Sequence, residues 1–205
     1  MNEQERSISF LAGWSGFLAV AIVVIGTLGS IMVSGWSYGV NTVSELGVMG
    51  STATFFNYCL VFGGLLLVIH GAVRGPKEIG VHRISACIIA FAGIFLMLAA
   101  AFTYDIDNGN INTNLLKVFC VLMMIAMLVE GYASKNEGLK GILVGGISVI
   151  TFVVVLVSYF VLDPAKYQIL AAVCIMIWMA ANSYCYMLSG IHFKGGVDIK
   201  ERVRA

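Results

Sequence analysis

Residues 142–162 read Ile-Leu-Val-Gly-Gly-Ile-Ser-Val-Ile-Thr-Phe-Val-Val-Val-Leu-Val-Ser-Tyr-Phe-Val-Leu. The stretch contains no charged side chain, and it is apolar in every direction around a helix axis instead of along one stripe. A helix of about 20 such residues is long enough to cross the hydrocarbon core of a bilayer. This run therefore predicts a transmembrane helix.

Five further runs of similar length and composition lie between short segments that carry the charged, Pro, Gly and Asn residues. A membrane β-barrel would instead need short strands of alternating character. We therefore predict an all-α polytopic membrane protein, a six-transmembrane-helix bundle that forms one domain over residues 1–205. The expected spans are 8–33, 53–72, 84–102, 115–132, 142–162 and 169–190.

The composition agrees with this class. The chain is 60% hydrophobic and 11% charged, whereas soluble domains are about 25% charged. A net charge of +1 provides no basic surface, so we expect no nucleic-acid partner. The first apolar run exceeds the apolar core of a secretory signal and has no small-residue cleavage site before Trp36, so we expect it to stay in the mature protein.

The basic residues are distributed unevenly along the chain, and cytoplasmic loops retain Lys and Arg. With the N-terminus inside, the outside keeps only Lys117 and Lys166. We therefore expect a multi-pass protein of the cell membrane with both termini cytoplasmic. The cytoplasmic set would be Arg6, Arg74, Lys77, Arg83, Lys135, Lys140, Lys194, Lys200, Arg202 and Arg204.

We expect no metal and no cofactor. The five cysteines fall inside the predicted spans without paired metal spacing, and the methionines lie among Leu, Ile and Val as packing residues. On the cytoplasmic side, His70, His82 and Glu130 are ionisable candidates near the ends of spans. A structural role close to the headgroups is expected for them, and a haem at His70 would lack a second histidine deep in another helix.

Polar residues gather instead in the predicted external loops. The first loop contains Asn41, Ser44 and Glu45, followed by Gly47, which could turn the chain back toward the membrane. The second loop contains Asp105 directly after the third span. We expect Glu45 to be substantially buried and to share a pocket with Asp105, where a cation or hydrogen-bond donors would relieve the repulsion of the two carboxylates.

The string Asn41-Thr-Val-Ser-Glu-Leu-Gly47, with Asn57 opening the second span and Phe102-x-x-Asp105 ending the third, resembles the six-span prokaryotic domain-of-unknown-function family nine-nine-eight. More distantly the chain is similar to the lipid-remodelling Frag1/DRAM/Sfk1 group. The resemblance places Asn57 with the external cluster. A histidine often follows the aspartate in that pattern, but this chain has Asn110, Asn112 and Asn114 there, so no metal or acid/base role is expected at that corner.

Three functions fit these observations. The first is a protein that binds or modifies lipid headgroups at the outer leaflet through Asn41, Ser44, Glu45, Asn57 and Asp105, with membrane lipid as the partner. The alternatives are a small-molecule or ion transporter or channel, and a non-catalytic structural subunit of a membrane assembly. Transport is weakened because no charged residue lies at a span midplane. The sequence leaves open whether the protein is an enzyme and whether it forms a homo-oligomer or binds a membrane-protein partner.

Overall fold

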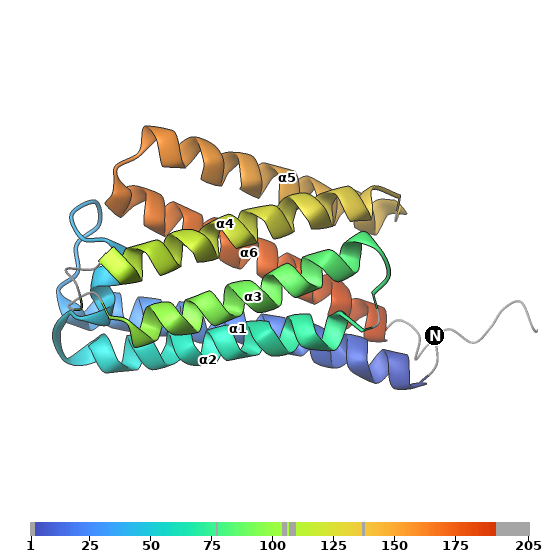
Figure 1. The fold of residues 1–205 in the computed structure, drawn as a ribbon, viewed down its shortest axis with the longest axis horizontal. Coiled ribbons are helices and arrows are strands. Elements are labelled where there is room, and N and C mark those ends of the chain that lie inside the picture. Colours follow the sequence, from blue (N-terminus) through green and yellow to red (C-terminus); the bar gives the residue numbers. More distant parts are fainter. Residues whose placement is uncertain (1–2, 77, 104–105, 107–109, 137, 192–205) are drawn as a thin grey trace, which may run out of the picture.

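The computed structural model describes residues 3–76, 78–103, 106, 110–136 and 138–191, and for 3–6, 136, 138–140 and 189–191 it describes the backbone only. Within these residues the chain is helical, with no strands (Figure 1). The α-helices are α1 (Glu3–Ser34), α2 (Ala53–Arg74), α3 (Val81–Ala101), α4 (Asn110–Ala133), α5 (Gly138–Val161) and α6 (Pro164–Ile191). Short 3-10 helices are η1 (Val43–Gly47), η2 (Gly50–Thr52) and η4 (Ser134–Asn136).

The helices lie side by side along the long axis of the molecule (Figure 1). Each packs against its neighbour in sequence, and α6 returns to pack against α1, so that the helices form a closed ring. The α1–α2 and α5–α6 connections lie at one end, which we call the Glu45 end. The α2–α3 and α4–α5 connections lie at the other, which we call the Arg74 end.

All six predicted spans are present. Six helices are long and apolar enough to cross a membrane, so the chain is an all-α six-helix membrane bundle. Large apolar side chains are exposed on the outer surfaces of the helices, which suits contact with lipid tails and not with water. Examples from five of the helices are Met32, Phe62, Phe91, Val121 and Ile150.

Among the helices that begin earlier than expected, α4 starts at Asn110 instead of Leu115 and α6 at Pro164 instead of Ile169. In α4 the polar residues belong to the helix because Asn112 is buried and donates a hydrogen bond from Nδ2 to the carbonyl oxygen of Ala99 at 2.6 Å. In α6 the proline suits the first helical turn, where no backbone N–H is needed. Polar residues thus extend two of the spans.

Small residues bring α2 and α3 into close contact. A Cβ atom on Gly64 would lie 2.6 Å from the carbonyl oxygen of Gly93, and one on Gly93 would lie 2.5 Å from that of Gly64. Ala86 and Ala90 face Gly71 in the same way. The small residues Ala86, Ala90 and Gly93 of α3 therefore serve packing within the bundle.

We expect Gly64→Ala to lower the free energy of unfolding by about 1–3 kcal/mol, because the added methyl group meets backbone atoms that cannot rotate away. Gly146→Ala on α5 is the matched control. A Cβ atom there meets nothing within 4 Å, and alanine favours the helix by about 1 kcal/mol. Unfolding followed by circular dichroism in mixed micelles measures both, and equal effects would contradict the close packing.

Candidate functional site

The α1–α2 loop covers the Glu45 end of the ring. Gly35 and Gly39 take positive φ angles of 75° and 76°, which lets the chain turn after α1. The Trp36 indole then donates a hydrogen bond from Nε1 to the carbonyl oxygen of Thr42 at 2.9 Å, and Leu46 in η1 is fully buried among the core residues. The loop is therefore anchored to the helices by an apolar side chain.

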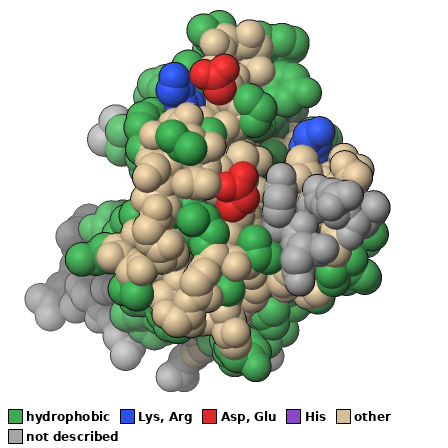
Figure 2. Space-filling model, turned by 90° about the vertical axis from the view of Figure 1, so that its left-hand side faces the viewer, with side chains coloured by type: hydrophobic (Ala, Val, Ile, Leu, Met, Phe, Trp, Pro, Cys, Tyr) green, Lys and Arg blue, Asp and Glu red, His purple; other side chains and the backbone are tan. Residues whose placement is uncertain are grey.

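Glu45 finds its partners inside its own loop. Its Oε2 accepts a hydrogen bond from Asn41 Nδ2 at 2.7 Å, and its Oε1 accepts one from Thr42 Oγ1 at 3.1 Å. The carboxylate is half-buried, less than the substantial burial that we predicted. Asp105 lies outside the described residues, and the shared pocket of the two acids stays a prediction. Among the described residues, Figure 2 shows few charged side chains on this face, within a surface of apolar and uncharged polar groups.

Asn57 and Ser44 tie η1 to two helices. Asn57 on α2 donates from Nδ2 to the carbonyl oxygen of Gly47 at 2.8 Å, and Gln168 Oε1 on α6 accepts from the backbone N–H of Ser44 at 3.3 Å. A Cβ atom on Gly47 would lie 2.7 Å from Asn57 Oδ1. Gly47 therefore permits this close approach, and its φ angle is not positive.

A cavity of about 120 Å³ lies beneath η1, inside the ring. On α2 its lining runs from Asn57 to Leu67, ten residues or about 15 Å at the helical rise. Its polar lining residues are Thr27, Ser44, Asn57, Asn112 and Gln168, of which Ser44, Asn57, Asn112 and Gln168 lie toward the Glu45 end. The remaining walls are apolar, including Ala19, Val23, Phe56, Leu60, Leu96, Leu116, Phe119, Met123, Ala172, Ile175 and Met179.

The predicted site residues therefore divide into two groups. Ser44 and Asn57 line the cavity, while Asn41 and Glu45 lie in the loop above and support its shape. Sequence reasoning missed Asn112 and Gln168, which also line it. Their signal is helical spacing, because Asn112 lies on one face with Leu116, Phe119 and Met123 once the helix is extended back to Asn110.

Asn112 presents an acceptor that no described residue uses. The residue is only 6% exposed, and its Nδ2 is engaged by Ala99, but its Oδ1 accepts no hydrogen bond. A buried acceptor left unpaired costs about 1–3 kcal/mol. The rim of the cavity thus offers a free carbonyl oxygen to any molecule that brings a hydroxyl or N–H group.

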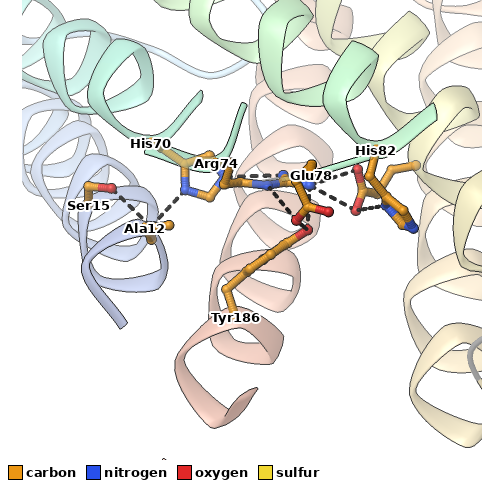
Figure 3. A network of polar contacts seen from close by, with 8 residues as sticks. Ala12, Ser15, His70, Arg74, Glu78, His82 and Tyr186 are labelled. Atoms are coloured by element: carbon orange, nitrogen blue, oxygen red, sulfur yellow. Dashed lines mark hydrogen bonds and ion pairs between the residues drawn. The ribbon is translucent and has the colours of Figure 1, made fainter. Parts of the chain in front are cut away.

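At the Arg74 end a second polar group is buried in the ring (Figure 3). Arg74 donates from Nη2 to both carboxylate oxygens of Glu130 at 3.1 Å, and the two residues are each only 2% exposed. The same Nη2 donates to the Tyr186 hydroxyl at 2.6 Å, and that hydroxyl donates to Glu78 Oε1 at 2.6 Å. The guanidinium carbon also lies 4.1 Å from the centre of the Tyr186 ring.

Two histidines extend this Arg74 network. His70 donates from Nδ1 to the carbonyl oxygen of Ala12 at 2.7 Å, and its Nε2 then accepts from Arg74 Nη1 at 3.3 Å. His82 Nδ1 lies 3.3 Å from Glu130 Oε1. Side chains or carbonyls from α1, α2, α3, α4 and α6 therefore meet in one network (Figure 3).

The network corrects two of our expectations. His70 is fully buried inside the bundle instead of being exposed to water or lipid, and both of its ring nitrogens are engaged, which leaves neither free to bind a haem iron. Arg74 was counted only as a cytoplasmic loop charge, although it is the centre of the network. Its partner Glu130 lies 56 residues away in the chain, beyond any local sequence pattern. Within the described residues, no three His, Cys, Asp or Glu side chains are grouped to hold a metal ion.

We expect Arg74→Met and Glu130→Gln each to lower the free energy of unfolding by about 3–5 kcal/mol, because each leaves its former partner as an uncompensated buried charge. The double variant removes both charges and should lose less than the two single losses combined. Lys135→Met, at an exposed position of the same end, is the control and should be neutral. Additive losses in a double-mutant cycle would contradict the coupling.

The comparisons with known proteins identify a family for the chain but do not indicate an activity. No curated protein and no solved structure matches the chain. The family model described as Protein of unknown function (DUF998) matches residues 15–183, a range that touches all six helices and includes Ser44, Glu45, Asn57, Arg74 and Glu130. The more distant likeness to the Frag1/DRAM/Sfk1 group stays a prediction. The chain belongs to the DUF998 family of membrane proteins.

Proposed function

We propose that this protein binds a membrane lipid at the Glu45 end, with one acyl chain in the cavity and the polar headgroup at its rim. The observation that carries the proposal is a narrow apolar cavity inside a membrane bundle, open to four polar side chains at one end. Its depth of about 15 Å suits a single extended chain better than a compact solute. The polar rim lies toward the Glu45 end and the apolar walls lie farther inside the bundle. A lipid has its headgroup and tail in the same order.

The headgroup contacts would decide which lipid binds. Lipid tails are as apolar as leucine side chains, so an acyl chain gains little by moving from the bilayer into an apolar cavity. Hydrogen bonds at the rim are different, because Asn112 Oδ1 is buried without a donor. A headgroup hydroxyl or N–H placed there would remove that cost. Glu45 and Asn41 hold the loop that closes over the rim.

The orientation of the bundle is part of the proposal. The distribution of basic residues favours a cytoplasmic Arg74 end, and the Glu45 end would then meet the outer leaflet of the cell membrane. Of the cytoplasmic set, Lys77, Lys194, Lys200, Arg202 and Arg204 lie outside the described residues. Among the described ones, Arg83 and Lys135 lie near the α2–α3 and α4–α5 connections at the Arg74 end.

The orientation can be tested by labelling. In a cysteine-free background, Asn110→Cys and Lys135→Cys place thiols at exposed positions close to opposite ends of α4. An impermeant maleimide added to intact cells should label position 110 and leave position 135 unlabelled until the membrane is opened. Labelling of 135 alone in intact cells would reverse the orientation, and labelling of both would contradict the membrane bundle.

Lipid binding can be tested by filling the cavity. Ala172 lines the cavity, while the adjacent Val173 is exposed on the outer surface of the same helix. We expect Ala172→Phe to reduce several-fold the lipid that stays bound through purification, as measured by native mass spectrometry. Val173→Phe should retain the wild-type amount. Thermal unfolding of both variants checks that the fold is kept, and equal retention by folded variants would contradict a chain in this cavity.

A further inference from the structure

A groove at the Glu45 end opens between α4, α5 and α6. It has a volume of about 370 Å³ and is lined by residues that include Thr113, Lys117, Tyr159 and Tyr167. Three residues, Leu116 and Cys120 on α4 and Gln168 on α6, line both this groove and the cavity inside the ring. The two spaces are therefore separated by these side chains and not by a helix backbone.

The helices around the groove make it a side opening of the ring. α5 packs against both α4 and α6, and it diverges from α4 toward the Glu45 end, where it is joined to α6 (Figure 1). Cys120 on α4 and Tyr167 on α6 line the groove from two different helices. Side chains can change rotamer without unfolding a helix, on a timescale far shorter than that of helix movements. A lipid in the bilayer can thus reach the cavity from the side.

Lys117 gives the groove its charge. It is exposed, it lies seven residues or about 10 Å along α4 from Asn110, and no described acidic residue pairs with it. The other described lysine of this end, Lys166, lies 3.4 Å from Asp163. A lysine on the lipid-facing part of a span is costly unless its amine reaches the headgroup layer or meets an anion.

Aromatic side chains fix the level of the groove in the bilayer. Tyr159 on α5 and Tyr167 on α6 meet edge to face with ring centres 5.2 Å apart. Tyrosines with an apolar ring and a polar hydroxyl collect where the hydrocarbon core meets the headgroups. Lys117 can extend its side chain so that its ammonium group reaches the same level. Lipid phosphates lie at that level.

We propose that the groove is a side portal for an acidic phospholipid, whose phosphate binds Lys117 while one acyl chain passes between Leu116, Cys120 and Gln168 into the cavity. This inference rests on the proposed lipid binding and names the class of lipid and its route. An acidic phospholipid fits because the groove offers Lys117, which pairs with no acid among the described residues, beside a channel for an apolar chain. A zwitterionic lipid would bring its own cation and gain less from Lys117.

The charge selection can be tested in nanodiscs that contain equal amounts of phosphatidylcholine and phosphatidylglycerol. Native mass spectrometry of the released protein should show a several-fold preference for phosphatidylglycerol in the wild type. Lys117→Gln should abolish that preference, and Lys117→Arg, which keeps the charge, should retain it. Lys166→Gln is the matched control, because it removes a lysine of the same end that is already paired with Asp163. This variant should keep the preference.

The route can be tested with a photoreactive phenylalanine derivative in place of Tyr159, compared with the same residue in place of Tyr58, an exposed position on α2. Cross-linking to phosphatidylglycerol should be several-fold stronger at position 159. If lipid is bound but Lys117→Gln does not change the preference for phosphatidylglycerol, or if cross-linking is equal at the two positions, the side portal is overturned. The proposed lipid binding would then still stand. A wild-type protein that releases no bound lipid at all would overturn both proposals.

Discussion

The ion pair between Arg74 and Glu130 is the contact on which the rest of this bundle depends. Two opposite charges are wholly buried within helices that are otherwise apolar. In such surroundings neither charge is tolerated without the other, and the remaining hydrogen-bonding groups must also be satisfied. Tyr186, His82 and His70 satisfy most of these groups, although Arg74 Nε has no hydrogen-bond partner, and they bring α6, α3 and, through the Ala12 carbonyl, α1 into a fixed arrangement.

The two ends of the ring consequently have opposite characters. At the Arg74 end the interior is filled by side chains that satisfy one another, which fixes the helices but leaves little for a ligand to bind. At the Glu45 end the helices enclose an apolar space, and apart from Thr27 the described polar side chains that line it lie at its rim. Small residues such as Gly64 and Gly93 hold α2 and α3 together between these ends. The buried polar network at the Arg74 end thus fixes the helices that enclose the apolar cavity at the Glu45 end.

The sequence predicted the class of fold because each span had to be long and apolar in order to cross a membrane, and that requirement is local. It predicted the starts of α4 and α6 less well, since a buried Asn112 bonded to Ala99 looks like a loop residue until its partner is known. Of the predicted site residues, Ser44 and Asn57 line the cavity, whereas Asn41 and Glu45 hold the loop above it. The Arg74 network could not be read from the chain because its members come from distant helices, and only packing brings them together.

The separations within that network also bear on how the chain is made. Arg74 leaves the ribosome long before its partners, with Glu130 following 56 residues later and Tyr186 112 residues later. Its position at the last residue of α2 lets the side chain reach the aqueous boundary in the meantime. The guanidinium can be withdrawn from water only once α4 and then α6 have been inserted. During biosynthesis α6 is therefore the last helix to join the network of the first four helices. A chain released before Tyr186 would lack one of the hydrogen-bond partners of the Arg74 guanidinium.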